Sequence, residues 1–165
     1  MTSTEQLTIR PLTVGDRGAL ARLPERVSRQ SAIARFHAGV RVLTDDLLDR
    51  LVDLESGRHE AIVAIDGRGV AGIARYVRDV DDESRAEVAV LVVDEWQRRG
   101  VATLMLRPLV ASALAAGITH FMADTPPENT AARHLLGSLA TTVSQRFVAG
   151  RTIAVVDLRD GFRQH

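Results

Sequence analysis

A short turn between two apolar stretches holds the residues whose types and spacing best suit ligand chemistry. Residues 94–103 read D-E-W-Q-R-R-G-V-A-T, between an apolar run at 86–93 and a longer stretch with apolar side chains at helical spacing. A strand that turns into a helix here leaves backbone N–H groups unpaired at the helix N-terminus, where the helix dipole also favours negative charge. The turn therefore predicts a pyrophosphate site made by Gln97, Arg98, Arg99, Gly100, Val101, Ala102 and Thr103.

The spacing within this turn differs from that of the common nucleotide loops. A P-loop needs G-x-x-x-x-G-K-[ST], but the chain has no Gly-Lys pair, and the turn itself lacks the G-x-G-x-x-G of a dinucleotide site. Arg98 and Arg99 either screen phosphate groups or are solvated surface charges. A basic helix start without any ligand is the alternative interpretation.

Glu87 is the best candidate for a catalytic base. It is the only acidic residue in the apolar run, and the two-residue period of a strand places it on one face with Ala89 and Leu91, opposite the valines of the run. A carboxylate there is expected to be partly desolvated, which suits it to accept a proton. The alternative is a solvated glutamate at a strand edge, paired with Arg85 or Arg75.

The composition sets limits on the function. With 21 basic and 21 acidic residues, the 165-residue chain has zero net charge and no overall field to attract nucleic acid or a membrane surface. The absence of cysteine excludes disulfides, thiolate nucleophiles and zinc-cysteine sites, and the five histidines lack metal-binding spacing, so no metal is expected. We expect a cytoplasmic location, because neither a secretory signal nor a run of 18 apolar residues is found.

The first half of the chain alternates between strand and helix patterns. A strand is expected at residues 7–12, a helix from the Thr13 cap to Pro24, a less regular segment at 28–42, and a second helix from Thr44 to near Gly57. Two apolar runs around residues 66–69 predict a hairpin, and the run at 86–93 adds a third strand. Three consecutive strands with short turns indicate an antiparallel meander.

The second half predicts a helix, a strand, a helix and two strands. The first helix ends at Gly117, with a kink or an early break expected at Pro108, which has no N–H to donate to the carbonyl of Leu104. A strand at 119–124, a helix at 129–139 and strands at 143–148 and 152–158 follow. Residues 1–165 should therefore form one mixed α/β domain, a mostly antiparallel twisted sheet flanked by helices. The apolar edge of the last strands favours a homodimer.

The motif Q-R-R-G-V-A resembles the acyl-CoA-binding signature Q/R-x-x-G-x-G/A of the GNAT superfamily of N-acetyltransferases. The predicted order of elements is similar to the whole GNAT fold, and P-P-E-N-T-A-A-R-H-L-L resembles the N-x-x-A-x-x-L segment that lines the far side of the coenzyme. The resemblance implies acetyl-CoA as cosubstrate and Asn129 as a coenzyme-binding residue, beside the helix-capping role that asparagine favours. It also implies direct transfer to an amine, with Glu87 accepting the proton from nitrogen.

The same resemblance implies roles for the backbone and a missing side chain. In the GNAT fold, amides of the fourth strand bind the pantetheine arm and stabilise the oxyanion; here these are Leu91, Val92 and Val93. The tyrosine that often protonates the leaving thiolate is replaced by Leu136. A general acid for the thiolate is therefore not evident in the sequence.

Shorter segments are similar to bacterial protein lysine acetyltransferases of the Pat type. Residues 28–36 (S-R-Q-S-A-I-A-R-F), 72–78 and 86–92 of this chain resemble their segments with S-R and R-F, with G-x-A-R-Y and with A-E-V-A. The likeness places their catalytic glutamate at Glu87. The acceptor is then either a protein lysine or a small amine. Tyr76, the only tyrosine, is expected to pack or to contact substrate. An acyl-CoA-binding regulatory module with little or no turnover stays as the alternative function.

Overall fold

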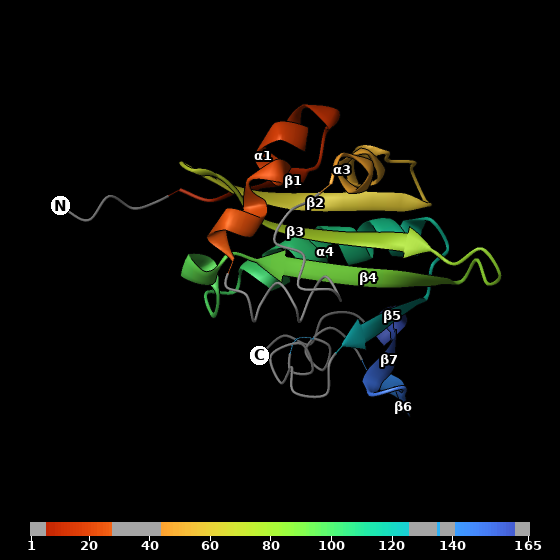
Figure 1. Ribbon diagram of the computed structural model, residues 1–165. Helices are drawn as coiled ribbons and strands as arrows, with labels where there is room; N and C mark the ends of the chain where they lie inside the picture. The colour runs from red at the N-terminus through yellow and green to blue at the C-terminus, as the bar shows by residue number, and fades with distance from the viewer. Residues whose placement is uncertain (1–5, 28–43, 126–134, 136–140, 161–165) are drawn as a thin grey trace.

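Seven strands form one sheet in the order β1-β2-β3-β4-β5-β7-β6 (Figure 1). The computed structural model describes residues 6–27, 44–125, 135 and 141–160. The strands are β1 (Thr8–Pro11), β2 (His59–Asp66), β3 (Gly69–Arg78), β4 (Arg85–Val92), β5 (His120–Thr125), β6 (Thr141–Val148) and β7 (Arg151–Asp157). All neighbouring strands are antiparallel except β4 and β5. The predicted mixed α/β fold with a mostly antiparallel sheet is confirmed.

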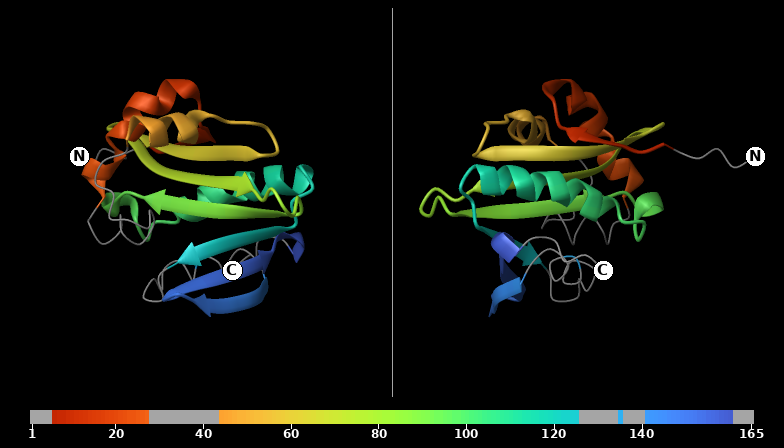
Figure 2. Two further views of the ribbon diagram at one scale, coloured as in Figure 1. Left: turned by 45° about the vertical axis from the view of Figure 1, so that its right-hand side comes forward. Right: turned by 180° about the vertical axis from the view of Figure 1, so that it is seen from behind.

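Helices flank both sides of this sheet. The helices whose two ends lie in the described residues are α1 (Arg17–Ala21), α3 (Asp45–Val52) and α4 (Val101–Ala115). Four short 3-10 helices accompany them: η1 (Val14–Asp16), η2 (Leu23–Arg26), η3 (Asp94–Trp96) and η4 (Leu158–Asp160). Helix α4 packs against β2, β3 and β4 and is seen lying across these strands from behind in Figure 2, while α1 and α3 pack together toward the other side. In the strand order, β4 is the central strand of the sheet.

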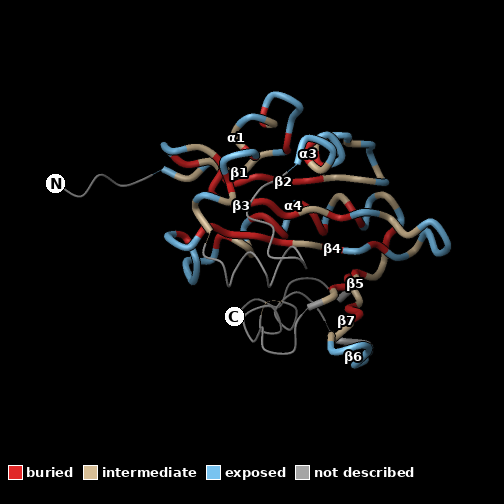
Figure 3. The backbone as a smooth tube through the Cα atoms, viewed as in Figure 1, coloured by how far each residue is buried: buried red, intermediate tan, exposed pale blue. Residues whose placement is uncertain are grey.

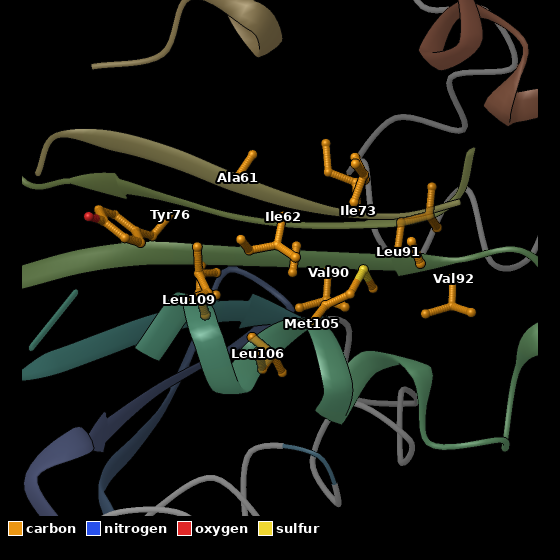
Figure 4. Close-up of a cluster of buried hydrophobic side chains, with 14 of the residues drawn as sticks. Ala61, Ile62, Ile73, Tyr76, Val90, Leu91, Val92, Met105, Leu106 and Leu109 are labelled. Carbon is orange, nitrogen blue, oxygen red and sulfur yellow. The ribbon is translucent and has the colours of Figure 1, made fainter. Parts of the chain in front are cut away.

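The core between α4 and the sheet is apolar. Ile62, Tyr76 and Val90, from three adjacent strands, lie beside Met105 and Leu109 of α4 (Figure 4). Buried positions run along the middle of these strands and along the inner side of α4 (Figure 3). This packing holds the C-terminal part of β4 and the start of α4 in a fixed relation.

The local signals in the sequence predicted several elements well. The hairpin turns where expected, between Asp66 and Gly69, and Thr44 caps α3 by accepting a hydrogen bond from the Leu47 amide (3.3 Å). The single helix expected from Thr13 to Pro24 is wrong, because the chain there forms the short α-helix α1 between two 3-10 helices, η1 and η2. The helix expected at 129–139 lies almost wholly outside the described residues.

Helix α4 continues through Pro108, so the early break expected there is also wrong. Pro108 and Leu104 are both exposed. The Leu104 carbonyl, which loses its helical donor, therefore lies on the solvent side of the helix, where water can bind it.

Residues 67–72 read G-R-G-V-A-G, which fits the spacing G-x-G-x-x-G. In the structure these residues form the hairpin turn and the beginning of β3. A strand follows instead of a helix, so the segment lacks the helix N-terminus on which a dinucleotide pyrophosphate would lie.

Strands β4 and β5 pair over a short distance and then separate. Their ladder joins Arg85 to His120, Ala86 to Phe121 and Glu87 to Met122, and no pairing continues beyond Glu87. On its other side β5 pairs with β7 along its whole length, and Figure 1 shows β5, β7 and β6 turning away from β4. The second half of β4 is therefore left without β5 as a neighbour.

Candidate active site

The backbone of β4 presents alternate residues to its two sides. The Asp79 amide donates to the Arg85 carbonyl (2.9 Å), and the Val93 amide donates to the Ala71 carbonyl (2.9 Å). Both bonds belong to one antiparallel ladder, in which every second residue directs its N–H and C=O to the partner strand. Leu91 and Val93 therefore face β3, and Val92 faces the side from which β5 has diverged.

This alternation of N–H directions along β4 limits which amides can bind the oxyanion and the pantetheine arm. Of the three amides named from the sequence, that of Val93 already donates to Ala71, and that of Leu91 has the same direction. The expectation that Val93 offers a free amide is wrong, because the strand period allows only alternate N–H groups to face a ligand beside β4. Val92 keeps the orientation that the role requires.

The turn after η3 has the backbone shape of an anion site. Arg98 (φ 62°) and Gly100 (φ 78°) are both left-handed, and for arginine this conformation is uncommon and costs free energy. Gly100 is the N-cap of α4, no side chain caps the helix, and a Cβ at Gly100 would meet no atom within 4 Å. The first amides of the helix, from Val101 to Thr103, are thus open to a ligand.

Gln97 joins this turn to β4. Its Nε2 donates to the carbonyl of Val92 at 3.0 Å and approaches Asp94 Oδ1 at 3.4 Å. The side chain thereby holds the turn next to Val92, whose amide faces the side from which β5 has diverged. Sequence reasoning had given Gln97 only a place in the motif.

A buried polar cluster of Arg26, Asp66 and Trp96, which the sequence analysis missed, packs next to the turn. Trp96 is buried and its Nε1 donates to Asp66 Oδ2 (2.7 Å), while Arg26 donates to both Asp66 oxygens (3.2 and 2.6 Å). Burial alone would raise the pKa of Asp66, but the hydrogen bonds from Arg26, the Arg68 amide and Trp96 lower it to about 2. The sequence offered little signal for this role, because an aspartate beside Gly67 reads as an ordinary turn residue.

Arg99 lies on this cluster and Arg98 does not. The guanidinium carbon of Arg99 stands 4.1 Å from the centre of the Trp96 ring, a cation–π contact. Both arginines are exposed beside the open helix N-terminus. The stacking restricts Arg99, so of the two it is the better prepared to meet a phosphate group.

Glu87 projects from β4 on the same face as Ala89, as the strand period predicted. Its side chain is exposed, so the expectation of partial desolvation is wrong: no described helix covers this part of the face. Of the alternative, a solvated glutamate at a strand edge, the solvent exposure is confirmed, and the edge position is wrong because β4 is central in the sheet. Arg85 pairs with Asp82 (3.3 Å), and Glu87 has no hydrogen bond or ion pair with a described residue.

Tyr76 has a structural role. It is fully buried, its hydroxyl donates to Glu60, and its ring lies 5.8 Å from that of Phe121. Glu60 also accepts from Ser112 Oγ of α4 (2.7 Å), and burial raises the pKa of Tyr76. The expectation that Tyr76 packs is confirmed, while Asn129 and Leu136 lie outside the described residues.

Nowhere in residues 6–27, 44–125, 135 or 141–160 do three or more His, Asp or Glu side chains converge as they would around a metal ion. In the same ranges no helix is both long enough and apolar enough to cross a bilayer.

A diverging pair of parallel strands beside an uncapped helix N-terminus agrees with what sequence comparison finds. Residues 29–139 match the family model described as Acetyltransferase (GNAT) family. The chain belongs to this family of acetyltransferases, as the Q-R-R-G-V-A motif predicted.

Two curated relatives are similar over most of this chain. Acetyltransferase Pat of Mycolicibacterium smegmatis is 31% identical over 137 residues, and Acetyltransferase PA5475 of Pseudomonas aeruginosa is 30% identical over 135 residues. The matches cover 82% and 79% of this chain. They cover 41% of the first relative and 72% of the second, so the chain spans less than half the length of the mycobacterial protein.

Solved structures support the same fold. The GNAT domain of S. lividans PAT superimposes with a TM-score of 0.83 at 27% identity, covering 93% of this chain and 97% of that domain. The structure of yncA from Salmonella typhimurium with its cofactor acetyl-CoA has a TM-score of 0.76 at 21% identity, covering 97% and 98% of the two chains. The second likeness concerns the fold alone.

Proposed function

We propose that this protein transfers the acetyl group of acetyl-CoA to an amine nitrogen, with Glu87 as general base. The observation that carries the proposal is the position of Glu87 as the last residue of β4 that pairs with β5. Beyond it the strands diverge toward the uncapped start of α4. The Glu87 carboxylate, the side of β4 without β5 as a neighbour, and the uncapped N-terminus of α4 therefore follow one another in one path along β4.

Each part of the path has a chemical task. The amides from Gly100 to Thr103, with Arg99, bind the pyrophosphate, and the pantetheine arm runs along the Val92 side of β4. The amine attacks the thioester carbonyl after Glu87 accepts its proton directly or through water, and the Val92 amide donates to the developing oxyanion. The new C–N bond forms, the C–S bond breaks, and coenzyme A leaves as the thiolate.

The resemblance to protein lysine acetyltransferases of the Pat type favours a protein lysine as acceptor, and a small amine is the other candidate. The chain itself contains no lysine, so a lysine acceptor belongs to another molecule. Asn129 as a further coenzyme ligand, the homodimer and the cytoplasmic location all stay predictions.

The alternative of an acyl-CoA-binding module with little turnover rests on one observation. The only tyrosine is buried and donates to Glu60, so in the described chain no tyrosine is available to protonate the thiolate. A thiolate of coenzyme A can leave without an acid, and we therefore place catalysis first.

A turnover assay that detects free thiol, run against a panel of amines and lysine-containing proteins, tests the proposal. Glu87→Gln should lower kcat by roughly 10²- to 10⁴-fold while the affinity for acetyl-CoA stays near that of the wild type. The matched control is Glu83→Gln, an exposed glutamate in the turn before β4, which should keep full activity. Full activity in Glu87→Gln would remove the base, and tight acetyl-CoA binding without any turnover would favour the regulatory module.

A further inference from the structure

The face of the sheet that carries Glu87 is partly exposed to solvent and carries a second charged side chain, Arg75. In the register of β3 and β4, Val77 lies opposite Glu87 and Arg75 lies opposite Ala89. All four side chains share the face turned away from α4, and Val77 is 42% exposed in the interior of a seven-stranded sheet. A small apolar surface therefore lies between a carboxylate and a guanidinium.

Arg75 stands out among the arginines of this region because it has no hydrogen bond or ion pair with a described residue. Burial lowers its pKa, and only the charge of Glu87 acts in the opposite direction. No hydrogen bond and no carboxylate within 4 Å is found for it in the described residues. By contrast, Arg78 donates to three carbonyl oxygens (2.6 to 3.1 Å) and Arg26 binds Asp66 (2.6 Å).

Among the described residues, no anion other than Glu87 acts on Arg75. His59, on the neighbouring strand, has a pKa lowered by burial and uses Nδ1 toward the Asp53 carbonyl (3.0 Å), so it adds no negative charge. A half-buried cation that no described group hydrogen-bonds costs free energy, and an anionic ligand that binds it directly would lower that cost.

We infer that Arg75 determines acceptor specificity by binding a carboxylate that the acceptor carries close to its reactive amine. The inference rests on the proposed function, since it takes Glu87 as the site of the amine. Arg75 and Glu87 are diagonal neighbours across one strand pair, so their Cβ atoms are about 7 Å apart and one small group can reach both. An aspartate or glutamate beside a protein lysine provides such a carboxylate, and so does a free amino acid.

Acceptor pairs that differ in one carboxylate test this inference. The first pair is a lysine peptide with glutamate or glutamine next to the lysine, and the second is an amino acid and its amide. The wild type should prefer the carboxylate member by about 10- to 100-fold in kcat/KM, the range of a charge-assisted hydrogen bond. The pair that shows the preference identifies whether the carboxylate comes from a protein or from a small molecule.

Three variants assign the preference to its residue. Arg75→Met keeps the length and apolar stem of the side chain and should reduce the preference to within about threefold while sparing the acceptor without a carboxylate. Arg75→Lys should restore part of the preference, because the charge returns without the planar fork. Arg85→Met is the control: it removes a cation two residues from Glu87 on the same face, but one that Asp82 already pairs, and it should keep the preference.

The outcomes separate this inference from the proposed function. Equal kcat/KM for both members in the wild type, or a preference that survives in Arg75→Met, overturns the role of Arg75 and leaves acetyl transfer intact. If no acceptor is turned over, calorimetry of the same pairs with coenzyme A present decides the matter. Tighter binding of the carboxylate member that depends on Arg75 supports the inference, and equal binding overturns it.

Discussion

At the scale of single residues, the turn between η3 and α4 shows how backbone shape and side chains divide the work of binding an anion. Two left-handed residues, Arg98 and Gly100, flank Arg99, and the helix they precede has no side-chain cap. Such N–H groups stay unpaired unless water or a ligand binds them. The free energy spent on a left-handed arginine is consistent with a functional role of this turn.

This division predicts unequal effects of substitution on coenzyme binding. Gly100→Glu should abolish acetyl-CoA binding in calorimetry, because bulk and negative charge then occupy the open N-terminus of α4. Gly100→Ala introduces the same backbone strain but neither the bulk nor the negative charge of glutamate, so it is the control for folding. Gln97→Ala loses the hydrogen bond to the Val92 carbonyl and should weaken binding by only about threefold to tenfold. Unchanged affinity in Gly100→Glu would remove the turn as the coenzyme site.

At the scale of elements, the distance between α4 and the sheet depends on one small residue. A Cβ at Gly72 of β3 would meet the Leu91 carbonyl oxygen and Met105 Cε, both at 3.0 Å. Met105 is flexible and can move, but the backbone of β4 cannot. Gly72→Ala should therefore lower the free energy of unfolding by about 1 to 3 kcal/mol in urea denaturation.

Gly18, in α1, gives a matched control of opposite sign. It is exposed, and a Cβ there would meet no atom within 4 Å. Gly18→Ala should raise the free energy of unfolding by about 0.4 to 1 kcal/mol, because alanine restricts the unfolded chain and suits a helix. A Gly72→Ala protein as stable as the wild type would show that α4 does not pack closely on β3.

The elements also show what the sequence could and could not predict. The hairpin at Asp66–Gly69, the cap at Thr44 and the motif before α4 depend on neighbouring residues, so local patterns were sufficient. The divergence of β4 from β5 depends on strands joined through a whole helix, and no local pattern encodes where their pairing ends. The sequence left the exposure of Glu87 undecided for the same reason, since it depends on which elements cover that face.

At the scale of the whole molecule, the sheet ends in β6, whose residues 144–148 are all exposed. β6 pairs with β7, and Phe147 and Val148 are 70% and 44% exposed. An apolar edge of this kind favours association with a second copy. Light scattering at micromolar concentration should give twice the chain mass of 18.0 kDa, and Phe147→Lys should shift it toward the single mass. Val80→Lys, at an exposed valine in the β3–β4 turn, is the control, and a wild-type mass of 18.0 kDa would contradict the dimer.

The cluster around Asp66 links η2, the hairpin and η3, so its ionisation bears on the stability of the whole fold. Its pKa is about 2 in the folded protein, against about 3.9 for an unfolded aspartate. The pKa is depressed by folding, so the stabilisation is complete above about pH 4 and is lost as the pH falls through about 2. The difference corresponds to roughly 2 to 3 kcal/mol of unfolding free energy for this one group.

Urea denaturation between pH 2 and 7 measures this dependence. The wild type should lose stability steeply below about pH 4, and Asp66→Asn should be less stable at pH 7 with a shallower acid slope. Asp16, whose pKa the hydrogen bond from Arg10 also lowers to about 2, supplies part of the slope that persists in the variant. Asp81→Asn, at an exposed turn position, is the control and should follow the wild type. An acid slope in Asp66→Asn equal to that of the wild type would show that folding does not lower the pKa of the Asp66 carboxylate.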